Sequence, residues 1–432
     1  MNTLPKVLLI DVNAWRQDLA SNTLMDIFRF WSPDSLAVVY TSSNLPNSEV
    51  CSHYFQIGEN QVMKSVYKPW LRVGRRVSNT NDSNNSDAVA EHNMRKFSQR
   101  SFTKLLRMVR EMGWKLGRWR TPALKEFVRS FNPDIIFVPI FPYAYMGRIQ
   151  KYIIKLTNKP TVCYLSDDNY SYDSCKSFID YLHRFWVRQY VGPLARNCNE
   201  MFVIIDKEKK DTDSRFGTNS VILTKAIDFT GREYKQKIIN ETLKFVYTGS
   251  LAIGRGESLA IVADVLNKLN GQGLKAELNI YSQTTPTKTL LTHINNGCSH
   301  FYGVVSHQEI DGILQEADVV IFAEALEGKQ RYIAKLSFST KITDYLASGK
   351  CILAIGDKEI APIDYFKNND SAIIATNSNE IESCLVRMLN NHELVLEYGK
   401  KAFECARRNH DLEKMKRTFM ETMMRASDKI SM

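Results

Sequence analysis

Long apolar runs and paired cysteine motifs are missing from this 432-residue sequence. No stretch approaches the roughly 18 apolar residues that a membrane-spanning helix needs, and the run after Lys6 is too short for a signal-peptide core. The eight cysteines are scattered without any C-x-x-C spacing, which argues against a zinc site and against a disulfide framework. We therefore expect a cytoplasmic protein, peripheral at most to the inner face of the cell membrane, that holds no metal.

Two common nucleotide-binding fingerprints are also missing. The spacing of Gly249, Gly254 and Gly256 does not fit the G-x-G-x-x-G turn of dehydrogenases, and no Walker lysine motif occurs. An acidic Asp211-Thr-Asp213 lies in a strongly charged segment, where exposure to solvent accounts for it. These absences exclude a dinucleotide-dependent dehydrogenase and a P-loop enzyme.

Acidic residues are scarce in one part of the chain. The segment from Arg72 to Arg120 contains twelve Lys and Arg but only four Asp and Glu, so it carries +8 of the formal net charge of +10. An Asn/Ser-rich stretch at 78–88 is expected to be a loop, and 94–119 has the spacing of a basic amphipathic helix. Its basic residues include Arg100, Lys104, Arg107 and Arg110. Such a helix suits an anionic membrane surface, although packing on its own domain explains it equally well, and no nucleic-acid-binding motif is present.

What the sequence does contain is a regular alternation of β-rich runs and helical patterns. In the first half the expected strands are 6–12, 35–41, 134–140, 161–168 and 200–206. In the second half they are 244–250, 276–282, 300–305, 318–323, 351–355 and 371–376. This alternation predicts parallel strands joined by crossover helices. We expect two doubly wound domains at 1–228 and 229–410, followed by a helix at 411–432 that crosses back to the first domain.

The segment SFSTKITDYLASGKCILAIG, residues 337–356, places hydroxyl groups and a lysine at the start of a helix. Hydroxyls there can cap unpaired backbone N–H groups, and the helix dipole leaves that end partly positive. Asp344 lies three residues after Lys341 and four after Thr340, so all three can share one helix face. The combination suits a ligand with both phosphate and sugar hydroxyls. A capped helix with a solvated Lys–Asp pair is the alternative.

Three segments give the sequence a specific resemblance: YTGSLAIGRGESL (247–259), HFYGVVSHQEIDGILQEADVVIF (300–322) and the segment 337–356. In these the chain resembles bacterial glycosyltransferases of family 4. The resemblance implies the GT-B fold, in which two Rossmann-like domains face a cleft. It also implies retaining transfer of a sugar from a nucleoside-diphosphate sugar to a hydroxyl acceptor, without a metal or other cofactor, in surface polysaccharide biosynthesis.

The resemblance also assigns the donor site to the second domain. Arg255 and Lys341 are expected to bind the diphosphate, and Asp344 the ribose hydroxyls. The chain departs from the family pattern at Leu336, where a first glutamate is usual, and at Ala260, where a lysine is usual. The other donor-side residues are expected to be Gly249, Ser250, His307, Glu324, Ser339 and Thr340.

The first domain is expected to bind a lipid-linked or saccharide acceptor. Asp167 and Asp168 end an expected strand where family members carry a catalytic His or Asp, although Asp168 can equally cap the segment that follows. Asn22, in the loop after the first strand, is a further acceptor-side candidate. A sugar-nucleotide epimerase of the same architecture and a non-catalytic membrane-surface scaffold are the alternative functions.

Overall fold

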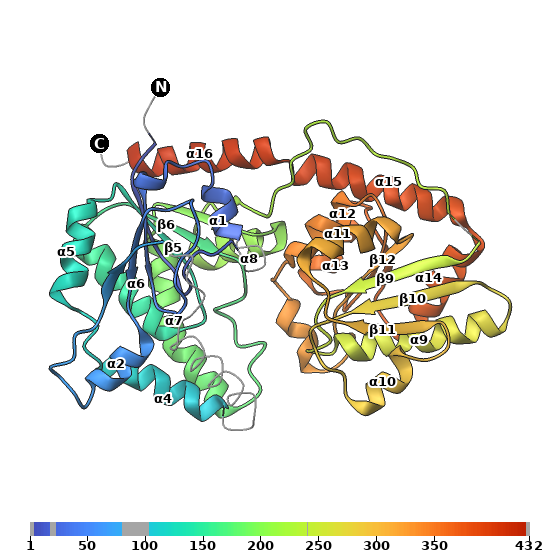
Figure 1. Ribbon diagram of the computed structural model, residues 1–432, viewed down its shortest axis with the longest axis horizontal. Coiled ribbons are helices and arrows are strands. Elements are labelled where there is room, and N and C mark those ends of the chain that lie inside the picture. Colours follow the sequence, from blue (N-terminus) through green and yellow to red (C-terminus); the bar gives the residue numbers. More distant parts are fainter. Residues whose placement is uncertain (1–3, 18–22, 80–102, 240, 429–432) are drawn as a thin grey trace. The chain divides into compact units, whose positions relative to one another are not determined.

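The computed structural model describes residues 4–17, 23–79, 103–239 and 241–428 (Figure 1). The chain divides into two compact units. Unit 1 comprises Met1–Ile204, Lys209–Leu223 and Lys416–Met432, and unit 2 comprises Ile205–Glu208 and Thr224–Met415. The main divisions between the two units therefore fall at 223/224 and 415/416.

Unit 1 is built on a sheet with the strand order β4-β3-β2-β1-β5-β6-β7-β8. Its strands are parallel except β4, which pairs antiparallel with β3. The strands are β1 Val7–Ile10, β2 Leu36–Tyr40, β3 His53–Gln56, β4 Arg75–Val77, β5 Ile135–Pro139, β6 Thr161–Leu165, β7 Glu200–Val203 and β8 Val221–Ile222. Every strand expected in the first half is found, whereas β3, β4 and β8 lie where none is predicted.

The unit 1 sheet is buried on both faces. One face packs against helices α4 to α7 around residues such as Trp114 and Phe127, and the other packs against α1 and α16. Phe419 of α16 lies within an aromatic cluster, its ring 5.0 Å from that of Phe28 and 5.5 Å from that of Phe202. The helices are α1 Thr23–Phe28, α2 Glu59–Ser65, α4 Thr103–Leu116, α5 Pro122–Phe131, α6 Ala144–Thr157, α7 Phe178–Asn197, α8 Asp206–Phe216 and α16 Leu412–Asp428.

Local sequence signals explain where several unit 1 helices begin and end. The Thr121 hydroxyl accepts a hydrogen bond from the Leu124 N–H at the start of α5, and Pro122 occupies the first turn, where its missing N–H costs nothing. Ser177 caps α7 in the same way, accepting from the Asp180 N–H. In the described residues no helix has the length and apolar character that crossing a membrane requires.

Unit 2 has a second sheet, with the order β11-β10-β9-β12-β13-β14 and parallel pairing throughout. The strands are β9 Leu243–Thr248, β10 Ala276–Tyr281, β11 Ser299–Gly303, β12 Val319–Ala323, β13 Cys351–Ile355 and β14 Ile373–Ala375. The helices are α9 Arg255–Gly271, α10 Lys288–Ile294, α11 His307–Glu316, α12 Thr340–Ala347, α13 Ala361–Asn368, α14 Ser378–Asn390 and α15 His392–Asn409. All six strands match those that the sequence predicts.

His410 joins the two ends of the unit 2 segment. Its Nδ1 lies 3.3 Å from the backbone oxygen of Lys225 and its Nε2 lies 2.8 Å from the Tyr365 hydroxyl. A carbonyl only accepts, so Nδ1 donates to Lys225 and Nε2 accepts from Tyr365. The backbone N–H of Ile227 also donates to the His410 carbonyl, so the segments around 225 and 410 are held together.

Unit 2 should lose stability in mild acid because of His410. Burial lowers the pKa of this imidazole from its ordinary 6.5 to about 4. A base with a depressed pKa contributes its stability above about pH 6.5 and loses it as the pH falls towards 4, so unfolding free energy should drop by about 2 kcal/mol between pH 7 and pH 5. Urea unfolding at the two pH values measures this, with His410→Gln as the matched variant. An equal pH dependence in both proteins would contradict the assignment.

Candidate functional site

The strand order of unit 2 places a crevice beside β9. The chain runs from β9 outward to β10 and β11 on one side, whereas β12, β13 and β14 continue on the other side. β9 and β12 are therefore neighbours from which the connections diverge, and they are parallel. In open α/β sheets ligands bind at the carboxyl ends of such a strand pair. The residues that follow Thr248 and Ala323 are thus placed to form a binding site.

A cavity of about 90 Å³ lies at these strand ends. It is lined by Tyr247, Thr248, Gly249, Ser250, Arg255, Ile321, Phe322, Ala323, Glu324, Ser339, Lys341 and Tyr345. Six of the residues that the sequence places on the donor side or in catalysis meet here: Gly249, Ser250, Arg255, Glu324, Ser339 and Lys341. Two cations and one carboxylate therefore converge on a single cavity within unit 2.

Gly249 keeps the floor of this cavity open. A Cβ at this position would lie 2.8 Å from the Tyr247 hydroxyl and 3.2 Å from Nζ of Lys341. Its N–H donates to the Tyr281 carbonyl, so the backbone cannot easily move away. A side chain here would crowd the lysine, and glycine lets the backbone and a ligand approach closely.

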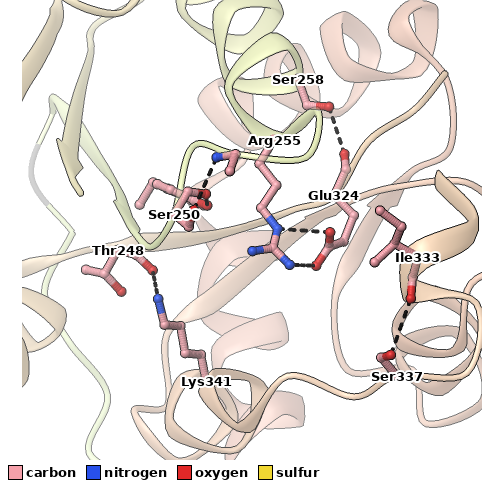
Figure 2. Close-up of polar contacts among 10 residues, drawn as sticks. Thr248, Ser250, Arg255, Ser258, Glu324, Ile333, Ser337 and Lys341 are labelled. Atoms are coloured by element: carbon pink, nitrogen blue, oxygen red, sulfur yellow. Dashed lines mark hydrogen bonds and ion pairs between the residues drawn. The ribbon is translucent and has the colours of Figure 1, made fainter. Parts of the chain in front are cut away.

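Arg255 is oriented by Glu324. Its Nε lies 2.9 Å from Glu324 Oε2 and its Nη2 lies 2.6 Å from Oε1, a two-bond contact to an acidic side chain that is 7% exposed (Figure 2). The Ser258 hydroxyl donates to the Glu324 backbone oxygen, which fixes the acidic residue in turn. Figure 2 shows Nη1 of Arg255 on the side away from Glu324. The guanidinium thus has a fixed plane, and one nitrogen makes no bond to the carboxylate.

Lys341 comes from the first turn of α12 and reaches the end of β9. Its Nζ donates to the Thr248 carbonyl at 3.1 Å (Figure 2). The Tyr345 hydroxyl, one turn later on the helix, donates to the same carbonyl at 2.9 Å. Burial, and then the nearby charge of Arg255, lower the pKa of Lys341 below its ordinary 10.5. A desolvated ammonium beside a second cation favours an anion as its ligand.

The start of α12 differs from the expectation in one respect. Ser339 is the N-cap residue, but its side chain makes no capping hydrogen bond. The Ser337 hydroxyl donates backwards to the Ile333 carbonyl, at 3.3 Å, instead of capping α12 (Figure 2). Helix N–H groups that are not capped by side chains are suited to bind an anion.

Asp344 does not lie in the cavity lining. Its carboxylate accepts two hydrogen bonds from Nζ of Lys225, at 2.6 and 2.8 Å. The Lys225 side chain is 16% exposed and that of Asp344 is 35% exposed, so this ion pair is partly buried. The Lys341–Asp344 pair that the sequence left open as an alternative is therefore not formed, because each residue has a different partner. The sequence missed Lys225, since 119 residues separate it from Asp344.

If Asp344 holds the ribose of a nucleotide, as the sequence resemblance implies, Asp344→Asn should weaken binding of a nucleoside diphosphate by about 10- to 150-fold, because hydrogen bonds to a charged acceptor contribute about 1.5 to 3 kcal/mol. Calorimetric titration with a nucleoside diphosphate measures this. Lys225→Met is the matched variant, since it removes the cation and leaves the carboxylate. Equal nucleotide affinity in wild type and Asp344→Asn would show that the carboxylate serves only the ion pair with Lys225.

The remaining candidates lie elsewhere. Thr340 begins α12 and is not part of the cavity lining. His307 begins α11, but its side chain lies outside the described residues, as does Asn22. Asp167 and Asp168 follow β6 in unit 1, as expected.

Asp168 is engaged by its own turn. Its carboxylate accepts from the backbone N–H groups of Tyr170 and Ser171, at 3.2 and 2.8 Å, and also from the Ser171 hydroxyl. Arg184 donates to its backbone oxygen at 2.9 Å. This is the capping arrangement that the sequence left open as an alternative to a catalytic role. Asp167 is exposed at the same turn.

Among the described residues no cluster of three His, Cys, Asp or Glu could hold a metal ion. The cavity instead contains aromatic residues that sequence reasoning missed, Tyr247 and Tyr345. The Tyr247 hydroxyl donates to the Ser250 carbonyl at 2.7 Å and so shapes the loop after β9. The sequence signal for each tyrosine was its place in a motif segment, since Tyr247 lies two residues before Gly249 and Tyr345 directly follows Asp344.

Comparison with known proteins yields no matching family model and no matching curated protein. Solved structures do match. HepE from Anabaena, in complex with UDP and glucose, matches with a TM-score of 0.62 and 12% identity, covering 97% of this chain and 99% of that chain. TarM from S. aureus, in complex with Fondaparinux, alpha-GlcNAc-glycerol and UDP, matches with a TM-score of 0.58 and 10% identity, covering 97% of this chain and 99% of that chain.

Sucrose-phosphate synthase from Thermosynechococcus elongatus matches with a TM-score of 0.58 and 11% identity, covering 96% of this chain and 97% of that chain. A structural likeness at such low sequence identity establishes the fold alone. The fold that the sequence resemblance implies is therefore confirmed over nearly the whole chain. The chain is an α/β protein of the GT-B fold, with two Rossmann-like units.

Proposed function

We propose that the chain is a retaining glycosyltransferase that transfers a hexosyl group from a UDP-sugar to a hydroxyl acceptor. The observation that carries this proposal is the cavity at the β9 and β12 ends. It brings together Gly249, Arg255 and Lys341 beside the start of α12. Two cations and a helix N-terminus are suited to a diphosphate, and the fold supports a sugar nucleotide as its carrier.

The structural relatives support uridine as the base. HepE has also been solved in complex with UDP-glucose, and TarM in complex with UDP. A matching trehalose-phosphate synthase from Burkholderia vietnamiensis is described as UDP-forming. We therefore propose a UDP-hexose as the donor for this chain.

The proposed chemistry places growing negative charge on the departing diphosphate. The acceptor oxygen bonds to the anomeric carbon on the face from which the diphosphate leaves, while the bond between that carbon and the diphosphate oxygen breaks and the hydroxyl proton passes to the departing diphosphate. The configuration is thereby retained. Lys341 and Nη1 of Arg255 would stabilise the charge on the leaving group. Both are held in place before the reaction, Lys341 by Thr248 and Arg255 by Glu324. Donors fixed in this way stabilise a transition state without first reorganising.

We further propose that unit 1 binds the acceptor and that the product belongs to surface polysaccharide biosynthesis. Asp167, exposed at the carboxyl end of a parallel strand, supports an acceptor role for this part of unit 1. The acceptor would be a saccharide, free or attached to a lipid carrier.

The test is to measure nucleotide binding first and transfer second. Calorimetric titration with UDP, GDP and ADP should give the tightest binding for UDP. Incubation with UDP-glucose or UDP-N-acetylglucosamine and a panel of saccharide acceptors should release UDP and yield an α-linked product, identified by the anomeric proton in NMR. A β-linked product would contradict retention. A new UDP-sugar formed without any acceptor would identify an epimerase, and no binding of any nucleotide would overturn the proposal.

A further inference from the structure

Helix α4 of unit 1 exposes large apolar side chains along one stripe. Val109, Met112 and Leu116 have helical spacing and are 58%, 40% and 61% exposed. The opposite side of the helix packs inward, since Trp114 is fully buried and Glu111 is 1% exposed. Exposed apolar groups on a single stripe are usually covered by a partner or a membrane when the protein functions.

Helix α7 carries a second stripe with the same spacing. Phe178, Tyr181 and Phe185 are 79%, 47% and 51% exposed. The two helices are in contact, and His183 Nε2 of α7 lies 3.7 Å from Glu111 Oε1 of α4 (Figure 1). This contact is buried, and both stripes lie on the exposed sides of their helices, away from it. We call the six exposed side chains of these neighbouring helices, three on each, the α4–α7 surface.

Aromatic side chains extend this surface beside α4. Tyr67 and Trp70, in the turn after α2, are 64% and 77% exposed. Arg118 follows α4 and donates to the Pro69 carbonyl at 2.5 Å, which holds the turn against the end of the helix. Trp and Tyr are enriched where proteins meet the water–lipid interface, because one end of each ring is apolar and the other polar.

The charges around the α4–α7 surface are mostly positive. Basic side chains exposed there are Lys68, Arg72, Arg107, Lys115 and Lys176. The carboxylates of the same region are fewer: Glu59 of α2 binds Arg110 at 2.7 and 2.5 Å, Asp180 of α7 accepts from the Ser177 hydroxyl, and Asp173 is exposed in the loop that carries Lys176. Glu111 is buried.

One residue of the expected basic face is therefore unavailable. Arg110 is tied to Glu59 and also donates to the Tyr145 hydroxyl at 3.1 Å, so it joins α4 to its own unit. Arg100 and the side chain of Lys104 lie outside the described residues. Any contact with a partner must rest on the apolar stripes and on the remaining cations.

We propose that the α4–α7 surface docks on an anionic lipid bilayer. The apolar stripes enter the boundary between headgroups and acyl chains, and the surrounding cations contact lipid phosphates. The exposed Lys and Arg around the surface complement the negative charge of such a bilayer. An amphipathic surface with Phe, Trp and Leu on its apolar side and Lys and Arg around it has the composition of interfacial membrane-binding helices. This inference rests on the proposed transferase function, for which docking on the bilayer would bring a lipid-linked acceptor within reach.

Co-sedimentation with vesicles tests the proposal. The full chain should sediment with vesicles of phosphatidylglycerol and phosphatidylcholine, bind pure phosphatidylcholine weakly, and be released by salt. Each basic residue at such a surface contributes about fivefold in affinity, so Arg107→Glu with Lys115→Glu should reduce the partition coefficient by at least about 25-fold. The matched control, Lys288→Glu with Lys358→Glu, changes two exposed lysines of unit 2 and should bind as wild type does.

A second pair of variants tests the apolar stripes. Leu116→Ser with Phe178→Ser should reduce the partition coefficient at least tenfold, whereas Ile238→Ser, at an 88% exposed position of unit 2, should not. All three positions are exposed, and substitutions at exposed positions rarely affect folding. The proposal is overturned by equal binding to neutral and anionic vesicles, or by dimerisation through these residues in ultracentrifugation without vesicle binding. The vesicle assays need no nucleotide, so membrane docking and the transferase function can fail separately. A Lys341→Ala variant that loses UDP binding but still sediments with vesicles would show that the two are independent.

Discussion

Lys341→Ala is expected to lower the affinity for UDP by about 10- to 150-fold, because a charge-assisted contact to a phosphate contributes about 1.5 to 3 kcal/mol. The fold should persist in this variant. The Thr248 carbonyl, which Lys341 contacts, also accepts from the Tyr345 hydroxyl at 2.9 Å. Removing the lysine therefore leaves no buried carbonyl without a partner. Calorimetric titration with UDP measures the effect, with Lys358→Ala, an exposed lysine of the same unit, as control.

The pH dependence of UDP affinity gives an independent reading of the same residue. Burial and Arg255 lower the pKa of Lys341 below 10.5, so the free protein loses this charge at a lower pH than an exposed lysine would. UDP affinity should therefore decline as the pH rises through that lowered pKa, and Lys341→Ala should lack this decline. Unchanged affinity in Lys341→Ala, at any pH, would remove the lysine from the site.

Arg255→Met is expected to reduce the transfer rate by about 10²- to 10³-fold, the range found when one preorganised donor to a developing charge is removed. The same change strands the buried Glu324 carboxylate, and breaking a buried ion pair typically costs about 3 to 5 kcal/mol of stability. Loss of transfer in the single variant would thus have two explanations. Initial rates with UDP-glucose and thermal melting must be measured together.

The double variant Arg255→Met with Glu324→Gln separates these explanations. Neutralising Glu324 removes the stranded charge, so the melting temperature should recover most of what the single variant lost, whereas transfer should stay low. Recovery of transfer along with stability would show that Arg255 acts only as the partner of Glu324. Glu324→Gln alone keeps the arginine and is the matched control.

Sequence patterns predicted the sheets well because buried parallel strands are short, apolar runs. They failed at the two edge strands of the unit 1 sheet, β4 with its exposed Arg75 and Arg76 and the two-residue β8, and also at β3, a strand of four residues that lies next to β4. An edge strand needs no continuous apolar run, since one side has no neighbouring strand. The predicted positions of the six unit 2 strands, by contrast, placed Arg255 and Lys341 near one another.

The ion pairs could not be predicted in the same way. Lys225 binds Asp344 across 119 residues and Arg110 binds Glu59 across 51 residues, distances at which no local pattern carries information. The turn of Asp168 is different, because its bonds run two and three residues ahead. The Asp-Asn-Tyr-Ser sequence already contained that alternative.

The position of Phe419 has a consequence for synthesis on the ribosome. Unit 2 is almost entirely one continuous stretch, 224–415, whereas unit 1 includes residues from both ends of the chain. Phe419 contacts Phe28, Trp31 and Phe202 across the core of unit 1. Domains at the N-terminus usually fold first during translation. In this chain the unit that is translated first cannot complete its aromatic core until the final helix has left the exit tunnel.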